Sequence, residues 1–131
     1  MRARSEAQKE LVRELTNFKR RLKRRNSRIN VLVFNGAAMD SAVEFSIQGG
    51  NGVELEFVIS RYADSCLGAH WYRLYHRVAT CEEMVGRIDK GRNLKEVLFQ
   101  AYLTVCSEES QREKQRIRNK LIIEGGLGKL C

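Results

Sequence analysis

The stretch AVEFSIQGGNGVELEFVIS, residues 42–60, carries the strongest fold signal in this chain. Apolar and polar side chains alternate on both sides of a glycine-rich centre, which is the two-residue period of a β-strand with one buried face. The centre, Gly49–Gly52, contains an Asn-Gly pair, which is typical of a tight hairpin turn. The stretch therefore predicts an antiparallel hairpin of Ala42–Gln48 and Val53–Ser60, with one apolar face and one wet, acidic face.

A third strand precedes the hairpin. Residues 29–34, INVLVF, are rich in β-branched side chains and lie between two turn-forming segments, Asn26-Ser27 and Asn35-Gly36. Both faces of this strand are apolar, which is typical of a strand covered on both sides. Together with the hairpin it predicts a three-stranded antiparallel meander.

Downstream of the hairpin, the apolar spacing changes to that of a helix. A first helix is predicted from near Gly68, and a short second one from the capping-box pattern at Thr80 and Glu83. Asn93 is the predicted cap of a third, strongly apolar helix. The polar residues 107–116 leave two alternatives, since that helix either continues through solvent as one long helix or ends where a fourth begins. The apolar stripe of the first helix comprises Trp71, Leu74, Tyr75 and Val78.

The beginning of the chain predicts a basic amphipathic helix. Apolar residues recur at steps of three and four between Glu6 and Arg25, and Ser5 can cap the helix. The stripe comprises Ala7, Leu11, Leu15, Phe18 and Leu22. It must be buried, either against the rest of the protein or as the seam of a homodimer.

These elements predict an α+β fold: an N-terminal basic amphipathic helix, a three-stranded antiparallel meander, then three or four C-terminal helices packed on the sheet. We expect two parts, a basic helical arm, 1–28, and a single α+β domain, 29–131. The 131 residues are 43% hydrophobic and 31% charged, enough to bury a core. Proline is absent, so turns must rely on Gly, Asn and Asp.

Charge is distributed very unevenly along the chain. The formal net charge is +8, and residues 1–28 hold eleven Lys or Arg against three Glu, whereas residues 29–131 hold thirteen of each sign. Within Lys19–Arg28, seven of ten positions are basic and none is acidic. Such a segment gains binding free energy by releasing counterions from phosphates, so it predicts a polyanionic partner.

The predicted nucleic-acid contacts fall into two groups. The first lies on the basic helix, and RNA is slightly preferred over DNA because Arg-dense helices suit the irregular grooves and bulges of RNA. The second is a concentration of aromatic and basic side chains beginning at Trp71, a type of surface that stacks on unpaired bases. The predicted contact residues are Arg13, Lys19, Arg20, Arg21, Lys23, Arg24, Arg25, Arg28, Tyr72, Arg73 and Arg77.

No catalytic residue, metal site or cofactor is predicted. Cysteine and histidine are ligand types for zinc, but the spacing of the four candidates lacks the close cysteine pair of a zinc knuckle. The candidates are Cys66, His70, His76 and Cys81. Glu44, Glu54 and Glu56 share the wet face of the hairpin, where alternation places acidic residues by default, so a metal-dependent nuclease is the trailing interpretation.

Two functions from different classes follow from these patterns. The first is a non-enzymatic protein that binds nucleic acid or a nucleoprotein complex. The alternative is a small inhibitor or adapter of viral or phage type that binds a host protein or ribonucleoprotein complex, such as a CRISPR-type nuclease, through the basic arm and the α+β body. The chain has neither a signal-peptide h-region nor an apolar run of membrane length, so we expect a cytoplasmic or nuclear protein without a membrane partner.

Overall fold

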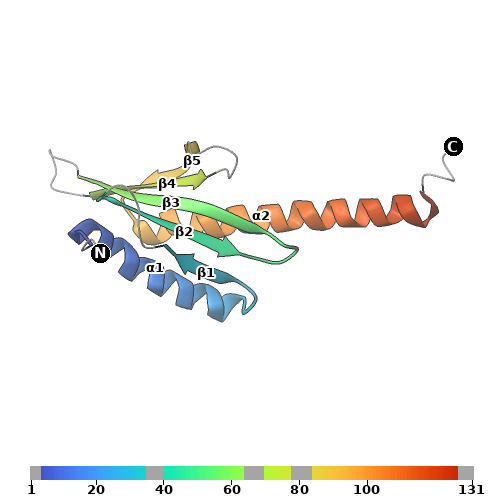
Figure 1. The fold of residues 1–131 in the computed structure, drawn as a ribbon, viewed down its shortest axis with the longest axis horizontal. Coiled ribbons are helices and arrows are strands. Elements are labelled where there is room, and N and C mark those ends of the chain that lie inside the picture. Colours follow the sequence, from blue (N-terminus) through green and yellow to red (C-terminus); the bar gives the residue numbers. More distant parts are fainter. Residues whose placement is uncertain (1–3, 35–39, 64–69, 78–83, 127–131) are drawn as a thin grey trace.

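The computed structural model describes residues 4–34, 40–63, 70–77 and 84–126. Two helices and a sheet account for most of them (Figure 1). The elements are α1, Glu6–Arg25; β1, Asn30–Val33; β2, Ala42–Gln48; β3, Glu54–Ala63; β4, His70–Arg77; β5, Met84–Gly91; α2, Leu94–Leu121; and a π-helical turn, η1, Ile122–Gly126. The fold is therefore α+β.

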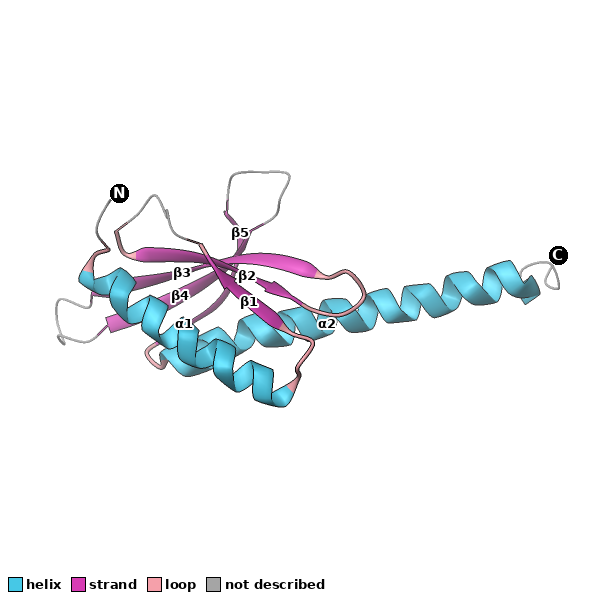
Figure 2. Ribbon diagram, turned by 60° about the horizontal axis from the view of Figure 1, so that its bottom comes forward, coloured by secondary structure: helices cyan, strands magenta, loops and turns pink. Residues whose placement is uncertain are grey.

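The five strands form one antiparallel sheet in which each strand pairs with the next along the chain, in the order β1-β2-β3-β4-β5. Phe45 of β2 lies opposite Phe57 of β3, which lies opposite His76 of β4. Both helices cover the same face of the sheet (Figure 2). Their apolar residues form one core with that face, in which Phe45 and Phe57 stack at a centroid distance of 5.4 Å.

The predicted hairpin and its turn are confirmed, although the second arm, β3, runs from Glu54 to Ala63. Asn51 and Gly52 have positive φ angles of 58° and 72°, and the Val53 N–H donates to the Gly50 carbonyl at 3.1 Å. Positive φ at both central residues is the geometry of the hairpin turn that an Asn-Gly pair favours. The turn also lies against α2, since the Gly50 N–H donates to Oε2 of Glu109 at 2.6 Å.

The predictions of a three-stranded sheet and of three or four C-terminal helices are wrong. His70–Arg77, in the region of the first of them, form β4, and Met84–Gly91, in the region of the second, form β5. The predicted starts of both, Gly68 and Thr80, lie outside the described residues. Asn93 does cap α2, which continues without a break to Leu121, so the alternative of one long helix is the correct one.

The period of β4 explains the error. Tyr72 and Leu74 are buried on the helix-covered face, while Trp71 and Tyr75 lie at alternate positions facing the other way. Over only eight residues, the spacing of these apolar side chains matches a helix by chance. Aromatic side chains favour strands, and eight register pairs with β3 stabilise that state.

The stripe of α1 packs onto the protein's own sheet. Ser5 caps the helix as predicted and forms a capping box with Gln8. Leu11, Leu15 and Phe18 are between 0% and 2% exposed and belong to the same core as the sheet and α2. The single chain therefore buries the surface that the homodimer alternative required.

A polar cluster fixes the first half of α1 to the sheet. The Glu10 carboxylate accepts hydrogen bonds from the Arg61 guanidinium of β3 and the Tyr72 hydroxyl of β4. Burial opposes the charge of Glu10, but these two donors outweigh it and lower its pKa. Burial, together with the hydrogen bond to Glu10, raises the pKa of Tyr72 to about 12.

Candidate nucleic-acid interface

The second half of α1 presents its basic side chains in three rows. Residues four apart lie on the same side of a helix, and the apolar stripe through Phe18 and Leu22 leaves two flanks and the outer surface for the rows. The rows are Lys19 with Lys23, Arg20 with Arg24, and Arg21 with Arg25. We call these six residues, together with Arg28 in the turn after α1, the cationic surface. All but Lys19, which is partly buried, are exposed.

The cationic surface is not neutralised by the described part of the chain. None of its seven side chains forms an ion pair with a described carboxylate. By contrast, Arg61 and Arg77 of the sheet pair with Glu10 and Glu44. The cationic surface therefore keeps its capacity to attract phosphate.

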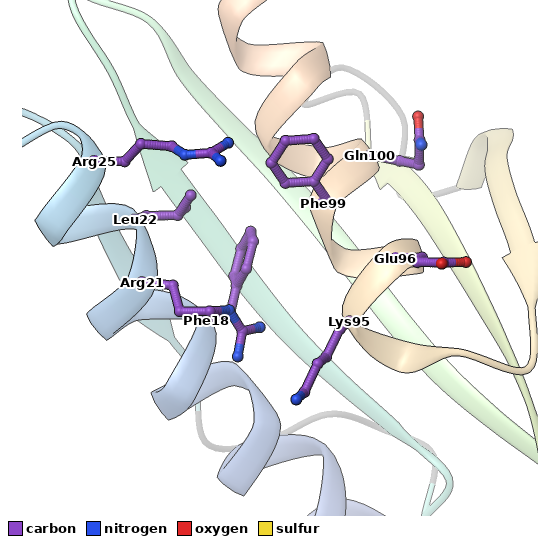
Figure 3. A pocket seen from close by; sticks show the side chains of 8 residues that line it. All are labelled: Phe18, Arg21, Leu22, Arg25, Lys95, Glu96, Phe99 and Gln100. Atoms are coloured by element: carbon purple, nitrogen blue, oxygen red, sulfur yellow. The ribbon is translucent and has the colours of Figure 1, made fainter.

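The row of Arg21 and Arg25 borders a groove between α1 and α2, with a volume of about 490 Å³ (Figure 3). The rings of Phe18 and Phe99 lie between the two helices, while the Lys95 side chain extends toward α1. The residues lining the groove are Phe18, Arg21, Leu22, Arg25, Lys95, Glu96, Phe99 and Gln100.

The groove combines an apolar aromatic interior with a cationic margin. Phe18 and Leu22, which are 2% and 3% exposed, form its floor. The Arg25 guanidinium lies 5.4 Å from the centroid of the Phe99 ring, a cation–π contact. The single carboxylate of the lining, that of Glu96, extends away from α1 (Figure 3). An anion that carries a flat apolar group would complement this surface in both charge and shape.

Comparisons of this chain with protein-family models, curated proteins and solved structures found no match. The function must therefore be argued from the geometry. The described helices also lack the run of apolar residues that a membrane crossing requires.

The structure places Arg13 in line with the cationic surface. It lies seven residues before Arg20 on the same outer side of α1, about 10 Å along the helix axis. Arg13 also lines a second hollow with Glu10 and Glu14, where the local charge is mixed. It therefore extends the cationic surface only at its margin.

The three predicted residues of β4 do not join the cationic surface. Tyr72 is 7% exposed and its hydroxyl is bound to Glu10, so the expectation that it lies at the surface is wrong. Arg73 and Arg77 occupy the sheet face that the helices do not cover. There the Arg73 guanidinium lies 4.7 Å from the centroid of the Tyr62 ring, and Arg77 pairs with Glu44 at 3.0 Å.

The two histidines among the candidate metal ligands are separated. His70 and His76 stand at opposite ends of β4, about 20 Å apart in an extended strand, and cannot share an ion. Cys66 and Cys81 lie outside the described residues. Within the described ranges, no three His, Cys, Asp or Glu side chains are grouped to hold a metal.

The hairpin glutamates lie away from α1. Glu44, Glu54 and Glu56 occupy positions that alternate with the core residues of β2 and β3, on the face opposite the helices. The expectation of a wet outer face is wrong for part of the hairpin, because Ser46 and Ser60 on that face are 0% and 2% exposed. The Glu44 carboxylate on the same face is paired with Arg77. The cationic surface and these glutamates therefore cannot form one site.

Sequence reasoning missed the contribution of α2 to the groove. Lys95 and Phe99 lie outside the buried stripe of α2, which includes Leu98 and Ala101. A large aromatic side chain off the buried stripe of a helix was the available signal. Its meaning depended on α1 packing beside α2, which periodicity alone does not disclose.

Proposed function

We propose that this protein binds nucleic acid through the cationic surface and catalyses no reaction on it. The observation that carries the proposal is the set of six basic side chains at the end of α1 and one in the turn after it, none of them in an ion pair with a described carboxylate. These charges face outward because the apolar stripe fixes the rotation of α1 on the sheet. RNA, free or in a ribonucleoprotein complex, is the preferred ligand.

The packing of α1 determines how it would meet a nucleic acid. One side of the helix is buried against the sheet, so only the exposed rows of α1 can meet a nucleic acid. These rows can lie along a phosphate backbone. Contacts of Lys and Arg with phosphates fix position and carry no sequence information, so we expect sequence-tolerant, salt-dependent binding.

The groove supports a binding role over a catalytic one. Its eight lining residues include no Ser, Cys or His, so no hydroxyl or thiol nucleophile meets a histidine base there. Lys95 and the two arginines supply positive charge. The arrangement suits electrostatic capture of a polyanion.

Fluorescence anisotropy tests the proposal. Labelled single-stranded RNA, duplex RNA and duplex DNA are titrated with the full chain and with a variant that carries alanine at five positions. The positions are Arg20, Arg21, Lys23, Arg24 and Arg25. We expect the full chain to bind and the variant to lose most of the affinity at low salt, with circular dichroism showing an unchanged fold. Failure of the full chain to bind any of the three ligands would refute the proposal and favour a protein partner.

A further inference from the structure

We propose that the groove between α1 and α2 holds one unpaired base of a bound strand against Phe99, with the adjoining phosphate among Arg21, Arg25 and Lys95. The inference rests on the proposed function and specifies the form of the ligand. A strand with single-stranded or bulged nucleotides would use the groove, whereas a fully paired duplex would contact only the cationic surface.

The shape of the groove fits a flat ring. Phe99 is half-buried and its ring is directed into the space between the helices, over the floor formed by Phe18 and Leu22 (Figure 3). The volume, about 490 Å³, lies in the range of small-molecule sites. Bases stack on aromatic side chains in sequence-tolerant recognition of single strands because every base has a π-face.

The charges of the groove place an anion beside that ring. Arg21 and Arg25 come from α1 and Lys95 comes from the first turn of α2, so positive charge reaches the groove from both helices. The carboxylate of Glu96 points away from α1 (Figure 3). A nucleotide joins a flat ring to a phosphate, so it matches both the aromatic interior and the charged margin of the groove.

Arg25 is able to exchange partners when a base enters. Its guanidinium lies over the Phe99 ring at 5.4 Å, and it pairs with no described carboxylate. A base that stacks on Phe99 displaces the guanidinium from the ring, and the guanidinium then turns to the phosphate. The cation–π contact is exchanged for a stacked base and a charge-assisted hydrogen bond.

The position of the groove favours a base of a continuing strand over a separate amphipathic anion. Arg21 and Arg25 are one row of the cationic surface, so a backbone leaving the groove meets Arg20 and Arg24 at once. A base can also keep its polar edge in water at the open side. The phosphates on either side of the inserted base therefore remain on the same charged surface.

The test compares affinities of the full chain for a 12-nucleotide single-stranded RNA and for the same strand in a duplex. Phe99→Leu keeps an apolar side chain of similar volume but removes the stacking surface. We expect single-strand affinity to fall between about 5-fold and 150-fold, from about 1 to 3 kcal/mol per stacked base, with duplex affinity unchanged. Phe99→Trp should retain single-strand affinity. Phe34→Leu is the matched control, since Phe34 is 40% exposed and lies outside the groove.

The outcomes separate this inference from the proposed function. If Phe99→Leu leaves single-strand affinity unchanged, or weakens single strand and duplex equally, the groove does not hold a base, and the proposed function stands on the salt-dependent binding of the unmodified chain. If the unmodified chain binds neither ligand, both the groove inference and the proposed function are overturned. The inference is supported if Phe99→Leu, but not Phe34→Leu, lowers the affinity for the single strand and leaves the affinity for the duplex unchanged. The circular-dichroism melting of Phe99→Leu should then match that of the unmodified chain.

Discussion

Replacing Tyr72 with phenylalanine tests the anchor that sets the position of α1. The hydroxyl of Tyr72 donates to the Glu10 carboxylate, and the tyrosine is only 7% exposed. A hydrogen bond to a charged group contributes about 1.5 to 3 kcal/mol. We therefore expect Tyr72→Phe to lower the free energy of unfolding at pH 7 by about that amount, measured by urea denaturation with circular dichroism.

The pH dependence of stability provides a second test of the same tyrosine. The pKa of Tyr72 is raised from 10.0 to about 12, first by burial and then by Glu10. A raised folded-state pKa favours the protonated, neutral phenol, so its stabilisation is complete below pH 10 and is lost as the pH rises toward 12. Two pKa units correspond to about 2.7 kcal/mol. The difference in unfolding free energy between the unmodified protein and Tyr72→Phe should shrink by up to this amount over that range.

The comparison must be made as a difference between the two proteins. Burial raises the pKa of Tyr62, and a hydrogen bond with Cys106 raises that of Tyr102, so both phenols also contribute to the alkaline range. These contributions are common to both proteins and cancel. A difference that stays flat from pH 9 to 12, or a loss below about 0.5 kcal/mol at pH 7, would refute the Tyr72–Glu10 contact.

Three further predictions concern other parts of the fold. Gly49→Ala should cost about 1 to 3 kcal/mol in chemical denaturation, because the added Cβ would lie 2.9 Å from Cγ1 of Val105; normal stability would contradict the close approach. Ile117→Gln should change stability by less than about 0.5 kcal/mol, because Ile117 is 47% exposed; a larger loss would reveal packing there. The lowered pKa of Glu10 means that its contribution to the free energy of unfolding is lost as the pH falls through that pKa. Glu10→Gln should therefore make the free energy of unfolding fall less steeply at acid pH, and an unchanged acid profile would show that Glu10 does not stabilise the fold through its charge.

The sequence predicted the parts of the fold whose signals are local. Ser5 before a regular apolar stripe predicted α1, and Asn51-Gly52 between two alternating segments predicted the hairpin. The residues of β4 were mistaken for a helix because Trp71 and Leu74 satisfy a helical spacing over a short window. Only pairing with β3, which is not local, decides between the two states.

The candidate site shows the same limit. The basic residues of α1 could be named from the sequence, because their density is a local property. Tyr72 was misplaced because its face depends on whether β4 is a strand. Lys95 and Phe99 were missed because the groove exists only where α2 packs beside α1.

The most direct test of the central claim compares the salt dependence of RNA binding in two variants of equal net charge. One carries alanine at Arg20, Arg21, Lys23, Arg24 and Arg25 on α1. The other carries alanine at five basic residues in the far half of α2, where side chains from Lys114 to Leu121 are all exposed. Those residues are Arg112, Lys114, Arg116, Arg118 and Lys120.

The two variants remove the same formal charge, so any difference between them reports position. Each lost phosphate contact lowers the log-log salt slope by about 0.7 to 0.9. An approaching backbone meets two of the three rows of α1 at once, so the α1 variant should lose about 2 to 4 units of slope, and the α2 variant less than about 1. Equal losses in the two variants would contradict the account, because binding would then follow net charge rather than the cationic surface.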